Sequence, residues 1–191
     1  MQKLTLADIR PPAVYERARE AARRRVIDLK RPRRVALGPD VTLVFENRDT
    51  LAFQVEEMLR AEHIGDPRKI QEEIDVYNGL LPGEGELSAT LFVEITDAGA
   101  IRPTLNRLVG IDEHVRLEVD GVVVRAEFEA GRSEADRISS VQYLRFRLPE
   151  ASRRRIGEAG ATVALACDHP AYAHRVALAD ETRASLAADL L

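Results

Sequence analysis

The 191 residues, 45% hydrophobic and 31% charged with a formal net charge of −4, have the balance of a folded globular protein and exclude a largely disordered chain. A single cysteine, Cys167, excludes an intramolecular disulfide framework and a zinc or iron–sulfur site built from several thiolates. No apolar run approaches the ~20 residues that cross a bilayer, and the N-terminus lacks an apolar signal segment, so we expect a soluble cytoplasmic protein without a membrane partner.

The N-terminal segment is predicted to be a basic helical arm. Thr5 and Asp8 have the spacing of a capping box, and apolar residues share one helical face over residues 12–30 before Pro32 ends the helix. Residues 1–34 contain 11 Lys and Arg against 4 Asp and Glu, a surplus of seven positive charges. Such an arm contacts either an acidic surface of its own molecule or an external anionic partner.

The next segment is predicted to be an antiparallel helical hairpin. Apolar residues recur at helical spacing over residues 41–63, which predicts one helix to about His63. Residues 41–45 also alternate as in a strand, so a strand that breaks to a helix near Asn47 is the competing assignment. Asp66 has the position of an N-cap for a second helix, which ends near residue 81 and packs against the first.

Alternating apolar and polar residues predict that the remaining chain is mainly β. Asp120 and Gly121, between two alternating runs, are the strongest hairpin signal in the sequence. The predicted strands span residues 87–95, 115–119, 122–128, 138–148, 162–167 and 172–178. Short helices are predicted over residues 103–108 and 149–157, and a C-terminal helix follows Asp180.

Together these elements predict a single α+β domain over residues 1–191. A helical N-terminal third, made of the long helix and the helical hairpin, packs on a mostly antiparallel sheet of about six strands and a C-terminal helix. The predicted parts are the basic helical arm (1–34), the helical hairpin (40–81) and the antiparallel β portion (86–191).

Four polar residues fall on or beside the apolar faces of the predicted hairpin: Arg48, Glu62, His63 and Glu73. A charge that is removed from water must be paired or must bind something, so two interpretations are open. In the first, Arg48 forms a structural ion pair with Glu62 or Glu73. In the second, the carboxylates and His63 bind a divalent metal or a polar ligand, and Arg48 holds an acid or another anion.

A second group of candidate residues crowds one predicted β-hairpin near the C-terminus: Cys167, Asp168, His169 and His174. These residue types can form a metal site beside a free thiol. The structural interpretation makes Cys167 a small buried hydrophobe, Asp168 a turn residue and His174 part of a sheet face. The sequence favours the structural interpretation, because a thiolate site usually has more ligands within reach.

The basic arm is a candidate surface for nucleic acid or for a protein partner, through Arg23, Arg24, Arg25, Lys30, Arg31, Arg33 and Arg34. Lys and Arg side chains bind a phosphate backbone by displacing its counterions. No aromatic residue that would stack on bases is interleaved with these cations over residues 23–34, and the chain as a whole is acidic, so nucleic acid is the less favoured partner.

Common catalytic signatures are absent from the sequence. No Glu precedes a histidine by three residues, as in carboxylate-bridged di-iron bundles, and no His-Glu-x-x-His occurs. No serine has a Gly-x-Ser-x-Gly context, and the glycines form neither a dinucleotide-binding fingerprint nor a phosphate-binding loop. The sequence therefore favours a non-catalytic protein without identifying a reaction.

Residues 46–50, which read Glu-Asn-Arg-Asp-Thr, begin a pattern that continues through residues 53–62, 77–78, 86–92 and 168–172. In these segments the chain resembles a bacterial family catalogued as domain of unknown function 3501. The family has no established activity or catalytic residues to carry over. Its members are often encoded beside rubrerythrin-like and iron–sulfur oxidoreductase proteins, so the resemblance implies an accessory role in a redox or oxidative-stress system.

Overall fold

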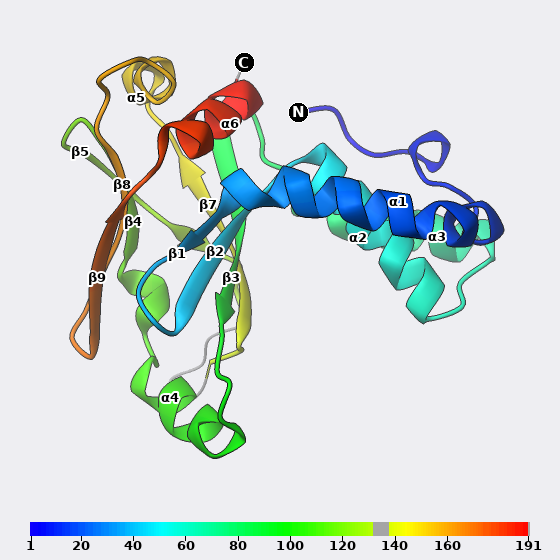
Figure 1. Cartoon of the computed structure of the whole chain (residues 1–191), viewed down its shortest axis with the longest axis horizontal. Helices are drawn as coiled ribbons and strands as arrows, with labels where there is room; N and C mark the ends of the chain where they lie inside the picture. The colour runs from blue at the N-terminus through cyan, green and yellow to red at the C-terminus, as the bar shows by residue number, and fades with distance from the viewer. Residues whose placement is uncertain (132–137, 191) are drawn as a thin grey trace.

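The computed structural model describes residues 1–131 and 138–190, which form an α+β protein with a helical N-terminal part and two antiparallel sheets (Figure 1). The helices are α1 (Pro12–Lys30), α2 (Arg48–Ala61), α3 (Pro67–Asn78), α4 (Ile101–Arg107), α5 (Glu150–Arg155) and α6 (Asp180–Leu190). The strands are β1 (Arg34–Ala36), β2 (Val41–Glu46), β3 (Glu86–Val93), β4 (Val115–Val119), β5 (Val122–Arg125), β6 (Glu127–Phe128), β7 (Val141–Arg147), β8 (Val163–His169) and β9 (Tyr172–Ala177). Within these ranges, no helix is both long and apolar enough to cross a bilayer.

The strands of the described residues form two sheets that share one core. The five-stranded sheet has the order β1-β2-β3-β7-β6 and the four-stranded sheet the order β5-β4-β8-β9. Leu43 and Leu91 of the five-stranded sheet are fully buried in the same cluster as Leu117 and Leu165 of the four-stranded sheet. The α+β class is confirmed, but the strands form a two-layer sandwich, because alternation predicts buried faces and not strand partners.

The chain passes between the two sheets where the sequence predicts one strand over residues 122–128. β5 pairs with β4, whereas β6, which begins only two residues after β5 ends, pairs with β7 of the other sheet. The hairpin before it is confirmed, because Asp120 and Gly121 have φ angles of 47° and 83°, as the turn residues of a type I′ hairpin require.

The prediction of one helix over residues 41–63 is wrong, and the competing assignment is confirmed. β2 is followed directly by α2, and Asn47 caps the helix: its side chain accepts a hydrogen bond from the Thr50 amide at 3.0 Å. The Thr50 hydroxyl in turn accepts one from the Asn47 amide at 2.9 Å. The helical prediction failed because β2 is buried on both faces, so its apolar residues lack a strict period of two.

The helical part has an apolar cluster of its own. Leu51, Val55 and Leu59 of α2 pack with Ile74 of α3, and α1 lies along α2 (Figure 1). The predicted bounds of α1 and the capping box of Thr5 are confirmed. α3 begins after its Asp66 cap, as predicted, and ends at Asn78 rather than near residue 81.

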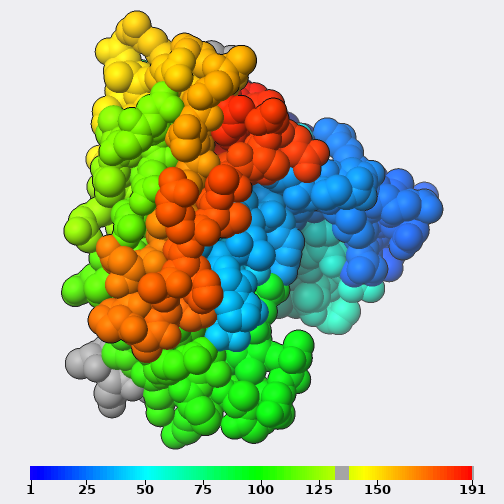
Figure 2. All heavy atoms as spheres, turned by 60° about the vertical axis from the view of Figure 1, so that its left-hand side comes forward, coloured from blue at the N-terminus to red at the C-terminus, as the bar shows by residue number. Residues whose placement is uncertain are grey.

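The C-terminal helix joins the helical part to the sheets. In Figure 2 the red α6 lies beside the blue segment at the end of α1, and α6 also contacts β3 and α5. α6 therefore packs on the segment Arg31–Arg33, which leads from α1 into the five-stranded sheet. This packing positions the end of β2, where the candidate site lies.

Candidate functional site

A polar cavity of about 200 Å³ lies on the face of the five-stranded sheet that points away from the sandwich core. Its walls come from β2, β3, β6 and β7 and from Gly79 and Leu80 after α3. Ser88, Thr90 and Tyr143 point into this region because they alternate along their strands with residues of the core. The cavity therefore lies between the sheet and the helical part.

Glu46, the last residue of β2, is the main polar group of the cavity. Its side chain is only 3% exposed, and its Oε1 accepts a hydrogen bond from the Thr90 hydroxyl at 2.8 Å. Its Oε2 is buried and has no hydrogen-bond partner in the described part of the chain. An unpaired buried carboxylate oxygen is unfavourable, so a donor that reached this atom after a small movement of the side chain would stabilise it.

Ser88 adds a second polar group without a partner. Ser88 lies directly opposite Glu46 in the β2–β3 ladder, so their Cβ atoms are on the order of 5 Å apart. Its hydroxyl oxygen is buried and has no hydrogen-bond partner among the described residues. Two buried polar atoms without partners among the described residues thus belong to residues that face each other across the β2–β3 ladder.

The surroundings of the cavity are negatively charged. Among the described residues, Glu46, Glu127 and Glu129 line it together with Arg145, which is paired with Glu86 at 3.0 Å, and Glu127 is paired with Arg147 at 3.1 Å. Burial raises the pKa of Tyr77, and acidic groups around it act in the same direction: Tyr143, Glu73, Glu46 and Glu62. The electrostatic environment therefore favours a positively charged ligand over an anion.

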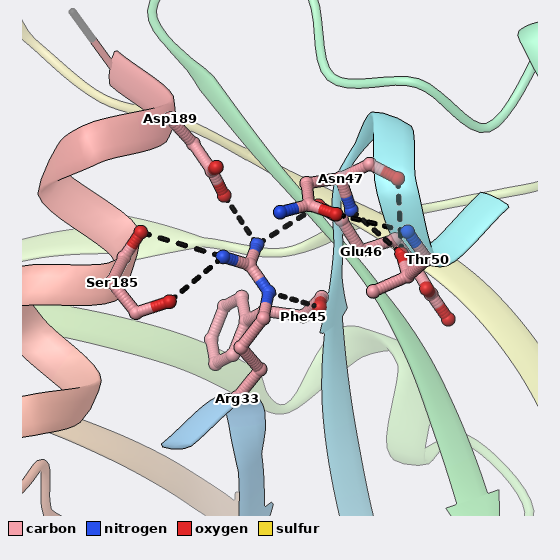
Figure 3. Close-up of polar contacts among 7 residues, drawn as sticks. All are labelled: Arg33, Phe45, Glu46, Asn47, Thr50, Ser185 and Asp189. Atoms are coloured by element: carbon pink, nitrogen blue, oxygen red, sulfur yellow. Dashed lines mark hydrogen bonds and ion pairs between the residues drawn. The ribbon is translucent and has the colours of Figure 1, made fainter. Parts of the chain in front are cut away.

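The end of β2 is held in place by Arg33, whose side chain is 1% exposed (Figure 3). Its guanidinium donates hydrogen bonds to the carbonyl oxygens of Phe45 at 2.8 Å and Glu46 at 3.2 Å, and to the Ser185 hydroxyl at 3.0 Å. It also forms an ion pair with Asp189. Figure 3 shows the guanidinium between α6 and the end of β2, so this network fixes the backbone that carries Glu46.

The ion pair between Arg33 and Asp189 lies out of contact with water. Burial raises the pKa of the Asp189 carboxyl, and the Arg33 guanidinium and the Asn47 side chain act in the opposite direction. The prediction that Arg33 belongs to an exposed partner surface is wrong, because the chain turns inward after α1 and buries this side chain under α6.

The structure does not bring together the four polar residues predicted on the helical hairpin. Arg48 and Glu62 lie at opposite ends of α2, roughly 20 Å apart along the axis. Arg48 forms an ion pair with Asp8 at 2.5 Å, while Glu62 and His63 are exposed. The geometric basis of the predicted site was a continuous helix from residue 41, which does not exist.

Glu73, on α3, and Glu62 both contribute to the electrostatic field at Tyr77, but neither lines the cavity among the described residues. Within residues 1–131 and 138–190, no group of three or more His, Cys, Asp or Glu has an arrangement that could hold a metal ion. Glu62 and Glu73 therefore act as separate charges and not as a set of metal ligands.

The basic arm is largely docked on its own molecule. Arg10 and Arg19 form ion pairs with Glu56 and Glu57 of α2, at 2.5 Å and 2.7 Å. Three of the predicted surface residues are also paired: Arg25 with Asp49, Arg31 with Asp28, and Arg34 with Glu94. Arg23, Arg24 and Lys30 make no ion pair with the described residues, so they are the cations that remain for an external partner.

The residues of the C-terminal hairpin have structural partners. Cys167 is buried in the sandwich core, and burial raises the pKa of its thiol. His169 accepts a hydrogen bond at Nδ1 from the Ala171 amide, and its Nε2 lies 3.0 Å from the Val109 carbonyl, which suits a neutral ring with a proton on Nε2.

The two outward-facing members of this group are also engaged. Asp168 forms an ion pair with Arg116 and a hydrogen-bonding contact with His114, whose Nδ1 lies 2.9 Å from the carboxylate. The His174 ring packs on Tyr172 with 4.4 Å between the ring centroids. These contacts agree with the structural interpretation and do not converge on one point.

Sequence reasoning missed Glu46, Ser88 and Thr90. A signal was present for Ser88 and Thr90, because they alternate with apolar residues in a strand that is buried on both faces. Polar groups on a buried face need hydrogen-bond partners. Glu46 ends an apolar run, and it could be paired with Ser88 only after residues 41–46 were known to be a strand.

All three residues lie in segments that carry the family resemblance, and comparisons with known proteins support that resemblance. The chain matches the family model described as "Protein of unknown function (DUF3501)" over residues 3–190. A search of curated proteins found no match. Among solved structures, the chain is similar to the crystal structure of a novel protein of unknown function from Burkholderia pseudomallei K96243, with 36% sequence identity, a TM-score of 0.93 and 100% of both chains covered. The chain therefore belongs to the DUF3501 family of proteins of unknown function.

Proposed function

We propose that the protein binds a small organic cation in the cavity beside Glu46. The observation that carries this proposal is the buried Oε2 atom of Glu46, which lacks a hydrogen-bond partner in the described chain and lines the cavity. An ammonium or guanidinium group would supply both the missing hydrogen bond and the opposite charge. The adjacent Ser88 hydroxyl would accept a second hydrogen bond from the same group.

The size of the cavity limits the ligand. About 200 Å³ corresponds to roughly seven water molecules, which suits a small amine and not a nucleotide or a large cofactor. The exposed carboxylates of Glu127 and Glu129 at the wall would add long-range attraction without direct pairing. No reaction is included in the proposal, which concerns only the binding of a cationic group.

The test is calorimetric titration of small amines against Glu46→Gln and Ser88→Ala. Suitable probes are ethanolamine, putrescine and agmatine, with ethylene glycol as a neutral analogue of ethanolamine. We expect the amines to bind and the glycol not to bind. Glu46→Gln should weaken amine binding by about 10- to 100-fold, because a hydrogen bond to a charged group contributes about 1.5–3 kcal/mol.

Glu72→Gln is the matched control, because Glu72 is exposed on α3 and does not line the cavity. It should leave amine binding unchanged. Glu46→Gln should keep or raise the melting temperature, since it removes a buried unpaired charge. If no amine binds to the wild-type protein, or if Glu46→Gln binds amines as tightly as the wild type, the cavity is not a cation site.

We further propose that the protein acts in the cytoplasm as a non-catalytic accessory of a redox or oxidative-stress system, as the family resemblance implies. Rubrerythrin-like or iron–sulfur oxidoreductase proteins would be its partners. The cations of α1 that remain unpaired among the described residues support a partner surface, although they do not identify the partner. Co-purification from cells that express the gene tests this role, and failure to retain any redox protein would argue against it.

A further inference from the structure

A groove separate from the cavity lies beside the second half of α1. It has a volume of about 450 Å³ and is lined by Val26, Ile27 and Phe53 together with four cations: Arg23, Lys30, Arg31 and Arg34. Arg23, Ile27 and Lys30 recur three or four residues apart, so they lie on one side of α1, while Arg31 follows the helix and Arg34 begins β1. Among the described residues, no carboxylate lines the groove.

The groove combines an apolar floor with positive edges. Ile27 is 58% exposed, which is unusual for an isoleucine, and Phe53 of α2 is half-buried next to it. Arg31 and Arg34 are already paired with acidic residues of this chain. Arg23 and Lys30 have no ion-pair partner among the described residues, so their charges face whatever occupies the groove.

We propose that this groove binds an acidic amphipathic helix of a partner protein. The apolar face of such a helix would cover Ile27 and Phe53, and its carboxylates would pair with Arg23 and Lys30. Along α1, Arg23 and Lys30 are about 11 Å apart, which corresponds to two helical turns and to apolar anchors at i, i+4 and i+7. The inference does not depend on the ligand of the cavity.

The same features argue against a nucleic acid as the occupant. Tight binding to a phosphate backbone usually involves 6–10 phosphate contacts, as an order of magnitude, whereas the groove has two cations outside intramolecular ion pairs. An exposed isoleucine between those cations contributes nothing to phosphate binding. Burial of the Ile27 and Phe53 side chains would instead stabilise the binding of a helix with an apolar face.

The experiment measures fluorescence anisotropy of labelled synthetic peptides with the full-length protein. The probes are helical peptides of about four turns, with Leu or Phe at i, i+4 and i+7 and Glu at the remaining exposed positions. Versions with Lys in place of Glu, and versions with scrambled order, test charge and amphipathicity. A labelled single-stranded oligonucleotide and vesicles of anionic phospholipid test the other anionic partners.

Two variants test the charged edges and the apolar floor of the groove separately. Arg23→Glu combined with Lys30→Glu should weaken binding of the acidic peptides at least tenfold, and Ile27→Asn should do the same through the apolar floor. Arg24→Glu and Val14→Asn are matched controls, because both residues are exposed on α1 and neither lines the groove. The controls should bind like the wild type.

The outcomes separate the alternatives. Saturable binding of the acidic amphipathic peptides, lost in the groove variants and kept in the controls, would support the inference. Absence of binding by every such peptide would overturn it. Preferential binding of the oligonucleotide or the vesicles, unaffected by Ile27→Asn, would also overturn it and would indicate a site for phosphate groups.

Discussion

Arg33→Met should destabilise the protein strongly, because it removes a buried guanidinium and keeps most of the apolar stem. The substitution leaves the carbonyl oxygens of Phe45 and Glu46 without this donor. It also leaves the carboxylate of Asp189 buried without its cation, since the Asp189 side chain is 8% exposed. The substitution thus removes buried contacts between α6 and β2, and not a surface contact.

The size of the effect follows from these lost partners. Removal of one member of a buried ion pair costs about 3–5 kcal/mol, and each orphaned buried acceptor adds about 1 kcal/mol or more. Because such contributions overlap, we expect a loss of about 4 kcal/mol in the free energy of unfolding. For a chain of this length, that corresponds to a fall in melting temperature of roughly 8–16 °C.

Equilibrium unfolding in urea is the assay, with Arg24→Met as a control at an exposed position of α1. The double variant Arg33→Met with Asp189→Asn should be less destabilised than the sum of the single variants, because Asn carries no charge that requires pairing. A loss below about 1 kcal/mol for Arg33→Met would refute the reasoning and would show that water or a rearranged α6 replaces the guanidinium.

Two further predictions concern the helical part. Hydrogen bonding to Arg19 lowers the pKa of Glu57 to about 2, so this carboxylate stabilises the fold above its unfolded pKa of about 4.5 and loses that contribution as the pH falls through 2. Between pH 5 and pH 2 the free energy of unfolding of Glu57→Gln should therefore fall by about 1 kcal/mol less than that of the wild type, a value reduced for solvent screening of the pair. Urea titrations over this pH range measure the difference, and an unchanged pH profile would contradict the prediction. Asn47→Ala should lower the free energy of unfolding by about 0.5–2 kcal/mol through loss of the α2 cap, whereas Asn47→Ser, which keeps a capping oxygen, should retain most of it; equal losses in both variants, measured by thermal unfolding, would exclude capping as the cause.

Local signals predicted those elements whose boundaries are set by neighbouring residues. α1 has the predicted bounds because Pro12 suits the first turn of a helix and Pro32 cannot continue it. α3 begins where Asp66 caps it, and the hairpin at Asp120 and Gly121 has the turn that these residues favour. Each of these interactions lies within a few residues of the chain and needs no distant partner.

The candidate site could not be predicted in this way. The helical wheel through residues 41–63 placed Arg48, Glu62 and His63 on one face, but residues 41–46 are a strand, and Arg48 and Glu62 lie at opposite ends of α2. Glu46 became a candidate because β3 lies beside β2 and puts Ser88 and Thr90 next to it. That proximity spans more than 40 residues, so no local pattern contains it.

The sequence by itself determined the α+β class, the long basic helix, the capped start of α3 and the β-hairpin, because these depend on hydrophobic periodicity and on turn and cap chemistry. Only the tertiary structure decided that residues 41–46 form a strand buried on both faces, and that the strands form two sheets. It also decided that Arg33 is buried and that Glu46 opens into a cavity. The physical reason is that side-chain burial and strand pairing depend on contacts between elements far apart in the chain. The free energy of these contacts can override the local secondary-structure preference of a segment.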